Sequence, residues 1–174
     1  MTVLRELKFG SWLLLATAAF AHPATAIDAP VGPPVGPVVL TISGAISETN
    51  SPAGLAFDQA ALDRLTHVTV KTETPWTQGL LEFSGVPLKA LLDLAGAKGS
   101  VISAFALNEY SVEIPMSDAD IAGLIIADRK NGTLMPVRDK GPLWIIYPLS
   151  DQPELQTEET HAKMIWQLKQ LEIK

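Results

Sequence analysis

RKNGTLMPVRDKGPLWIIYP, residues Arg129 to Pro148, is the stretch that decides the fold class. Asn131-Gly132 separates two runs of strand-forming residues, Leu124–Arg129 and Thr133–Val137, and this pair predicts a tight β-hairpin. Farther along, Leu143–Tyr147 (LWIIY) is a wholly apolar run bounded by prolines, which is typical of a buried strand. The stretch therefore predicts a sheet of short strands rather than a helical domain.

The same pattern of short strands extends outward on both sides. Further strands are predicted at Val38–Ile46, His67–Glu73, Leu80–Phe83, Val101–Leu107 and Tyr110–Ile114. Short helices are predicted at Phe57–Leu65 with Asp58 as cap, at Pro87–Gly96 with Pro87 in the first helical position, and at Ser117–Ala122. After a helical turn around Glu158–Lys163, the C-terminal residues fit a helix or a strand equally well. Many strands with few, irregularly spaced helices indicate an α+β fold.

The N-terminus has the features of a signal peptide. Arg5 and Lys8 precede the uncharged apolar run Phe9–Ala21, and Ala24-Thr25-Ala26 offers a small-residue cleavage pattern. The run is shorter than the roughly 20 residues that span a bilayer. We expect residues 1–26 to be a cleaved general secretory signal, 27–37 a Pro/Gly-rich tether, and 38–174 one domain, periplasmic or secreted, without a stable membrane anchor after cleavage.

Charge and composition exclude several functions. Cleavage removes Arg5, Glu6 and Lys8, which together carry +1, so the net charge changes from −6 to −7. An acidic domain is unsuited to nucleic acid or an anionic lipid surface, because phosphates must be neutralised by Lys and Arg. The chain has no cysteine, which rules out thiol nucleophiles, thiolate metal ligands and iron–sulfur clusters.

Common catalytic and metal-binding motifs are missing from the sequence. The mature chain has two histidines, His67 and His161, which lie far apart and lack the HxH or HExxH spacing of metal ligands. Glu158, Glu159 and His161 fit either a metal cluster or a solvated helix face. There is no GxSxG motif and no Gly-rich phosphate loop. No metal site is predicted.

Two loops have the composition of a binding site. One is Thr72–Gly79 (TETPWTQG), and the other is Val137–Pro142 (VRDKGP), which leads into the apolar LWIIY strand. Arg138 and Lys140 in the second loop would suit an anion such as a phosphate. The alternative is a charged turn in which Arg138, Asp139 and Lys140 pair with one another in water.

The order of these motifs resembles the molybdopterin-binding domain of the sulfite oxidase family. The resemblance covers about Val38 to Ile173, and each of its motifs is weak alone. It implies that family's mixed α+β fold and a strand at Trp166–Ile173. It rests on the loop containing Trp76 followed by FSGVPLKALLDLAGA (Phe83–Ala97), ALNEYSVEIP (Ala106–Pro115), RKNGTLMPVRDKGPLWIIYP (Arg129–Pro148) and KMIWQLKQLEI (Lys163–Ile173).

The resemblance also implies where a cofactor would bind. In catalytic members a cysteine thiolate ahead of the tryptophan binds molybdenum, and Thr72 stands at that position here; a neutral hydroxyl is a poor ligand by comparison. The family's Asp-Gly-Tyr corresponds to Asn108-Glu109-Tyr110, its His-Gly loop to Arg138–Gly141, and an arginine after it to Trp144. The cofactor-binding positions carried over are Thr72, Trp76, Asn108, Tyr110, Arg138 and Lys140.

Two functional hypotheses follow from these departures. Export of a folded molybdenum protein calls for a twin-arginine signal, whereas this n-region is LRELK. The first hypothesis is therefore a divergent, non-redox member of the fold that binds a small anionic ligand or a periplasmic protein between the two loops. The second is an oxidoreductase that holds molybdopterin without cysteine. A third reading is an unrelated structural or assembly protein.

Overall fold

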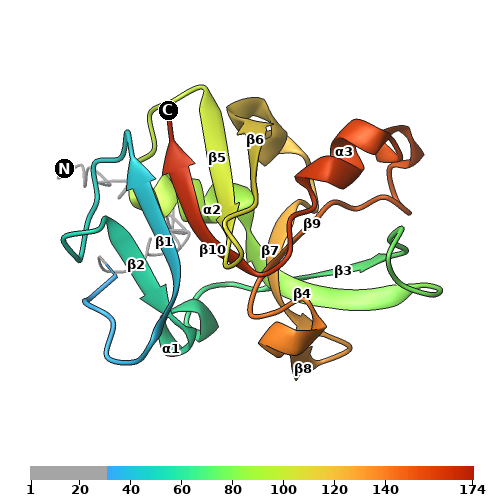
Figure 1. Ribbon diagram of the computed structural model, residues 1–174, viewed down its shortest axis with the longest axis horizontal. Coiled ribbons are helices and arrows are strands. Elements are labelled where there is room, and N and C mark those ends of the chain that lie inside the picture. The colour runs from blue at the N-terminus through green and yellow to red at the C-terminus, as the bar shows by residue number, and fades with distance from the viewer. Residues whose placement is uncertain (1–30) are drawn as a thin grey trace, which may run out of the picture.

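The computed structural model describes residues 31–174, which form two five-stranded β-sheets with a few short helices (Figure 1). The predicted signal peptide and the first part of the predicted tether lie outside these residues. Residues 31–37 have no regular secondary structure. The backbone N–H groups of Val35 and Gly36 donate to the carboxylate of Asp58, at 2.9 and 2.8 Å.

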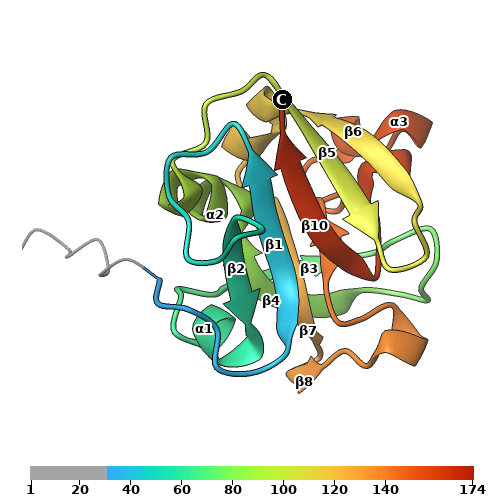
Figure 2. The same ribbon diagram turned by 60° about the vertical axis from the view of Figure 1, so that its left-hand side comes forward.

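The first sheet has the strand order β2-β1-β10-β5-β6. Its central pair, β1 and β10, is parallel, and every other pair is antiparallel. The C-terminal segment is therefore a strand at the centre of a sheet, as the resemblance implied, and Figure 2 shows it between β1 and β5. The strands are β1 (Val38–Gly44), β2 (Leu55–Asp58), β5 (Val101–Ala106), β6 (Ser111–Pro115) and β10 (Leu168–Ile173).

The second sheet has the order β3-β4-β7-β8, and β9 also pairs with β7. The predicted hairpin at Asn131-Gly132 is confirmed, with both residues at positive φ, although β8 is only two residues long. The LWIIY strand is confirmed as β9, whose residues are fully buried. The strands are β3 (Val68–Thr72), β4 (Leu81–Pro87), β7 (Ile125–Lys130), β8 (Thr133–Leu134) and β9 (Trp144–Ile146).

Three short α-helices and three 3₁₀ turns connect the strands. The carboxylate of Asp58 accepts the N–H of Ala61 and caps α1, as predicted. Gly96 ends α2 in the left-handed conformation. The helices are α1 (Gln59–Asp63), α2 (Leu88–Ala95) and α3 (Glu158–Lys163), and the 3₁₀ turns are Met116–Asp120, Val137–Asp139 and Pro153–Leu155.

The structure corrects several predicted boundaries. Phe57 belongs to β2 rather than to α1, because its side chain is buried, as are those of every residue in this strand. The strand predicted to stop at Ser84-Gly85 continues to Pro87, with a shift of register between Ser84 and Gly85. A Cβ on Gly85 would lie 2.0 Å from the carbonyl oxygen of Ile126, so glycine here marks close strand pairing rather than a turn. Pro87 is the cap of α2 and not its first residue.

One hydrophobic core contains residues of both sheets. Leu40 and Leu171 from the first sheet and Phe83 and Ile125 from the second are wholly buried members of one cluster. The second sheet lies behind the first in Figure 2, with α2 along one edge. Among residues 31–174, no helix has the length and apolar character needed to cross a membrane.

A candidate binding cleft

An open cleft of about 280 Å³ lies where the β3–β4 loop, the β5–β6 turn and the segment from α3 to β10 meet. Its wall is largely apolar and aromatic, with the amide of Asn108 and the imidazole of His161 as polar groups. Such a wall is typical of pockets that bind small organic molecules. The lining residues are Trp76, Ala106, Asn108, Tyr110, His161, Ala162, Met164, Ile165 and Trp166.

A group of tryptophans forms the back of the cleft. The ring of Trp76 meets that of Trp166 edge to face, with centroids 5.2 Å apart, and that of Trp144 at 6.1 Å. Trp144 is fully buried, and its indole N–H donates to the carbonyl of Met164 at 3.0 Å. Trp76 remains 37% exposed. The buried ring therefore supports two rings that face solvent.

The loop that carries Trp76 is held by its own threonines. The backbone N–H of Thr77 donates to the carbonyl of Thr74 at 3.2 Å, which closes a turn around Pro75 and Trp76. The hydroxyls of Thr74 and Thr77 are 2.8 Å apart, and the Thr74 hydroxyl also accepts the N–H of Trp76. Because Thr74 is buried, these bonds anchor the turn and fix the direction of the indole.

Lys140, in the RDKGP loop, lies over two of the tryptophan rings. Its Nζ lies 5.3 Å from the ring centroid of Trp166 and 5.6 Å from that of Trp144, within cation–π range. Its backbone has positive φ, and the N–H of Gln167 donates to its carbonyl. A Cβ on Gly141 would lie 1.8 Å from the carbonyl oxygen of Met135, so only glycine fits at this corner.

The charges of the RDKGP loop do not pair with one another. Asp139 pairs with Lys130 at 2.6 Å, and this hydrogen bond lowers the pKa of the Asp139 carboxyl. Within residues 31–174, Arg138 and Lys140 have no salt bridge to a carboxylate. No salt bridge joins Asp139 to Arg138 or Lys140, which contradicts the alternative of a self-paired turn. Lys140 therefore brings to the aromatic group an ammonium group that has no salt-bridge partner in the part of the chain that the structure describes.

The β5–β6 turn closes the other side of the cleft. Glu109 takes positive φ, and the side-chain oxygen of Asn108 accepts the N–H of Tyr110 at 3.2 Å. This bond occupies the oxygen of the Asn108 amide and leaves its nitrogen as the donor that could reach a ligand. Tyr110 is 52% exposed, so much of its side chain is free to contact a ligand rather than being packed in the core.

Thr72, predicted at the metal-ligand position, lies outside the cleft lining. It is wholly buried, and its hydroxyl donates to the carbonyl of Glu73 at 3.0 Å and accepts the N–H of Ser150 at 3.1 Å. Arg138 is exposed and does not line the cleft. Of the six predicted positions, Trp76, Asn108 and Tyr110 line the cleft, Lys140 stands on its aromatic wall, and Thr72 and Arg138 do neither.

Sequence reasoning missed His161 and Trp166 as lining residues. The imidazole of His161 lies 6.2 Å from the Trp76 ring, and Glu158 and Glu159 do not share the cleft with it. A histidine and a tryptophan five residues apart, on either side of a helix end, were the available signal. This spacing could not be interpreted from the sequence, because the segment fitted a helix and a strand equally well.

The residues present do not fit molybdopterin held as the resembling family holds it. That mode needs a thiolate on the metal, and the hydroxyl at the corresponding position is buried and already bonded to Glu73 and Ser150. Arg138, predicted with Lys140 as a phosphate partner, does not line the cleft.

Comparison with known proteins supports the fold. No protein-family model matches the chain, and no curated protein sequence matches it. Among solved structures, it is similar to the sulfane dehydrogenase SoxCD from Paracoccus pantotrophus, with 22% sequence identity and a TM-score of 0.56. The match covers 77% of this chain but only 37% of that chain. It confirms the predicted α+β fold of the sulfite-oxidase-type molybdopterin-binding domain.

Proposed function

We propose that this protein is an exported binding module that holds a small organic anion with a planar, apolar body. The ligand would lie in the cleft between Trp76 and Tyr110. Its flat body would stack against indole and phenol rings, and its anionic group would meet Lys140. The fold would thus serve as a binding scaffold without molybdenum redox chemistry.

The observation that carries the proposal is the position of Lys140. An ammonium group without a carboxylate partner in residues 31–174 lies 5.3 Å from a tryptophan ring at the edge of an open aromatic cleft. A cation held on aromatic faces stays partly desolvated, and this strengthens its attraction for an incoming anion. The chain has a net charge of −6, and its overall electrostatic field repels anions. The positive charge of Lys140 would attract an anion locally in spite of that field.

The test is a titration with two probes of equal shape. Benzoate and its neutral analogue benzamide are added to the protein, and binding is followed by tryptophan fluorescence and ligand-observed NMR. We expect benzoate to bind more tightly, because only it carries the anionic group. In Lys140→Gln, benzoate affinity should fall about tenfold, which corresponds to roughly 1.4 kcal/mol, while benzamide affinity should change little.

Arg138→Gln is the matched control, because Arg138 is a neighbouring cation that, unlike Lys140, makes no cation–π contact with the tryptophans of the cleft wall. It should leave both affinities unchanged. Equal binding of the two probes, or unchanged benzoate binding in Lys140→Gln, would refute the proposal. So would molybdenum and pterin in near-stoichiometric amounts in protein purified from its native host, because that result supports the oxidoreductase hypothesis.

A further inference from the structure

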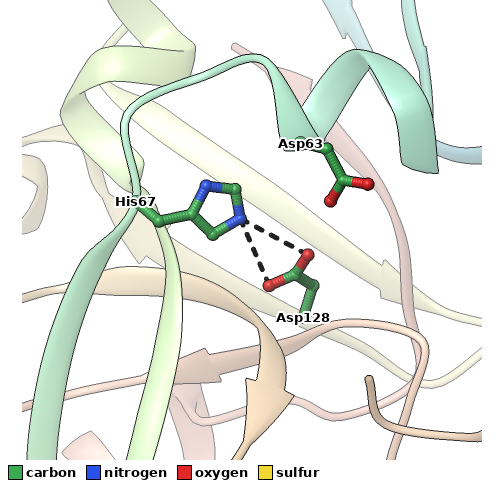
Figure 3. A group of neighbouring side chains, drawn as sticks. All are labelled: Asp63, His67 and Asp128. Carbon is green, nitrogen blue, oxygen red and sulfur yellow. Dashed lines mark hydrogen bonds and ion pairs between the residues drawn. The ribbon is translucent and has the colours of Figure 1, made fainter. Parts of the chain in front are cut away.

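A second cluster of polar side chains lies at the end of α1, among residues that do not line the cleft. Asp63 is the last residue of α1, His67 directly precedes β3, and Asp128 lies on β7 (Figure 3). One ligand-type atom from each of the three residues lies within 4.8 Å of the others. Residues from a helix, a loop and a strand thus converge on one point.

The hydrogen bond on the far side of His67 fixes which ring nitrogen faces the cluster. Nδ1 lies 3.0 Å from the carbonyl oxygen of Leu65, which can only accept, so Nδ1 carries the proton. In the neutral ring, Nε2 then presents a lone pair toward Asp128. A backbone carbonyl that orients a histidine in this way is typical of metal-ligating imidazoles.

Asp128 supplies an unsatisfied acceptor. The residue is 1% exposed, and its Oδ1 has no hydrogen-bond partner among residues 31–174. His67 Nε2 lies 3.4 Å from Oδ1 and also 3.4 Å from Oδ2. Two ligands on a tetrahedral ion with bonds of about 2.1 Å are separated by roughly 3.4 Å, so this spacing suits a shared cation. A buried carboxylate oxygen beside a lone pair is unfavourable unless a positive charge lies near both.

The guanidinium of Arg129 now provides that positive charge. Its Nη1 lies 3.2 Å from His67 Nε2 and donates to Asp128 Oδ2, and its Nη2 donates to Asp63 Oδ1 at 2.7 Å. All three cluster residues therefore contact one cationic group. The side chain of Arg129 is 26% exposed, so the guanidinium borders solvent. Even so, Asp128 Oδ1 receives no hydrogen bond from any of residues 31–174.

We infer that Asp63, His67 and Asp128 form a binding site for a divalent transition-metal ion, with Arg129 as the competing internal cation. One imidazole nitrogen and two carboxylates are a donor set that suits Zn²⁺ or Co²⁺. Gln59 donates to both carboxylates, at 3.0 Å to Asp63 and 2.7 Å to Asp128, and would hold them in place. Binding requires that the guanidinium leave the ligand atoms, so the metal and Arg129 exclude each other.

The test uses Zn²⁺ and the purified full chain, prepared without a histidine tag. Isothermal titration calorimetry at about pH 7.5 should show one saturable Zn²⁺ site, and Co²⁺ should give visible absorption bands that Zn²⁺ abolishes. His67→Gln should weaken Zn²⁺ binding at least tenfold and remove the Co²⁺ bands. His161→Gln, which alters a histidine outside the cluster, should bind Zn²⁺ normally.

Arg129→Gln tests the competition directly. It removes the internal cation and retains a hydrogen-bond donor, so Zn²⁺ affinity should rise about tenfold. A merely structural role for Arg129 would leave that affinity unchanged or lower it, and either result overturns the inference. Absence of saturable Zn²⁺ binding in the unaltered chain, or equal binding by His67→Gln, overturns it as well. Circular dichroism confirms that each variant is folded before it is titrated.

Discussion

The loop between β3 and β4 begins in a closed corner and ends at an open cleft. At the last residue of β3, where the loop departs, the Thr72 hydroxyl is wholly buried and bonded to Glu73 and Ser150. Four residues later, Trp76 is 37% exposed and faces a cavity of about 280 Å³. Both positions belong to the segment that the family resemblance marks as functional.

The contrast separates two kinds of polar and aromatic residue. A buried group that already has its hydrogen-bond partners stabilises the fold and has little left to offer a ligand. An exposed ring beside an ammonium group that has no salt-bridge partner can still make contacts with a ligand. Thr72 belongs to the first kind, and Trp76 with Lys140 belongs to the second. Variants at the two ends should therefore affect different measurements.

The largest effect is expected from the buried ring that supports the cleft. Trp144→Ala removes a fully buried indole and its bond to the Met164 carbonyl, so the free energy of unfolding should fall by about 3–5 kcal/mol. Trp76→Ala should cost about 1 kcal/mol, because that ring is partly solvated, and should weaken benzoate binding instead. Urea denaturation gives both energies. Equal losses of unfolding free energy in the two variants would contradict the assignment of Trp144 to support and Trp76 to the binding surface.

A smaller loss of stability is expected in the closed corner. Thr72→Val keeps the shape of the side chain but removes the hydroxyl, which leaves the N–H of Ser150 and the carbonyl of Glu73 without this partner. We expect the free energy of unfolding to fall by about 1–3 kcal/mol and benzoate binding to remain unchanged.

Thr69→Val is the matched control, because Thr69 lies on the exposed face of the same strand. Its effect should stay within about 0.5 kcal/mol. If Thr72→Val were as harmless as Thr69→Val, the corner would not depend on the hydroxyl. If it abolished ligand binding in a folded protein, Thr72 would belong to the site after all.

Much of the fold could be predicted because local rules and tertiary structure agree there. Asn131-Gly132 can form only a few turns, Gly96 ends a helix, and the LWIIY run must be buried. The prediction was wrong where long-range pairing overrode local signals. Gly85 looked like a turn residue, but it lies within β4, where close approach to Ile126 on β7 excludes any side chain. The sequence alone does not display that partner.

The candidate site was predictable only in part, for a related reason. Trp76 and Lys140 stand in loops with recognisable composition, so those two loops could be singled out, whereas Tyr110 was reached only through the family resemblance. Whether a residue faces the cleft depends on contacts far away in sequence. The backbone N–H of Ser150 donates to the buried hydroxyl of Thr72, and Asp139 forms its salt bridge with Lys130 rather than with Lys140. Asp63, His67 and Asp128 could not be grouped from the sequence for the same reason. Asp128 is far from the other two along the chain, and only the folded structure places it beside them.

The smallest effect on stability is expected from Asp58, a buried carboxylate that accepts hydrogen bonds from three backbone N–H groups. Its signature is a dependence of stability on pH in the acid range. The N–H of Gly36, then those of Ala61 and Val35, donate to its carboxylate and lower its pKa. A lowered pKa in the folded state means that this carboxylate stabilises the fold above the ordinary carboxyl pKa of about 3.9, and that the contribution is lost as the pH falls through the lowered value.

Urea midpoints measured between about pH 2 and 7 should therefore show the unaltered chain more stable than Asp58→Asn near neutral pH, with the difference shrinking below about pH 4. Asp58→Asn should keep part of the acid sensitivity, because Arg129 lowers the pKa of Asp63 and Lys130 lowers that of Asp139. Asp151→Asn, at an exposed carboxylate, supplies the background slope. A difference that grows on acidification would mean that Asp58 binds its proton more readily in the folded chain, the reverse of what three donated N–H groups require.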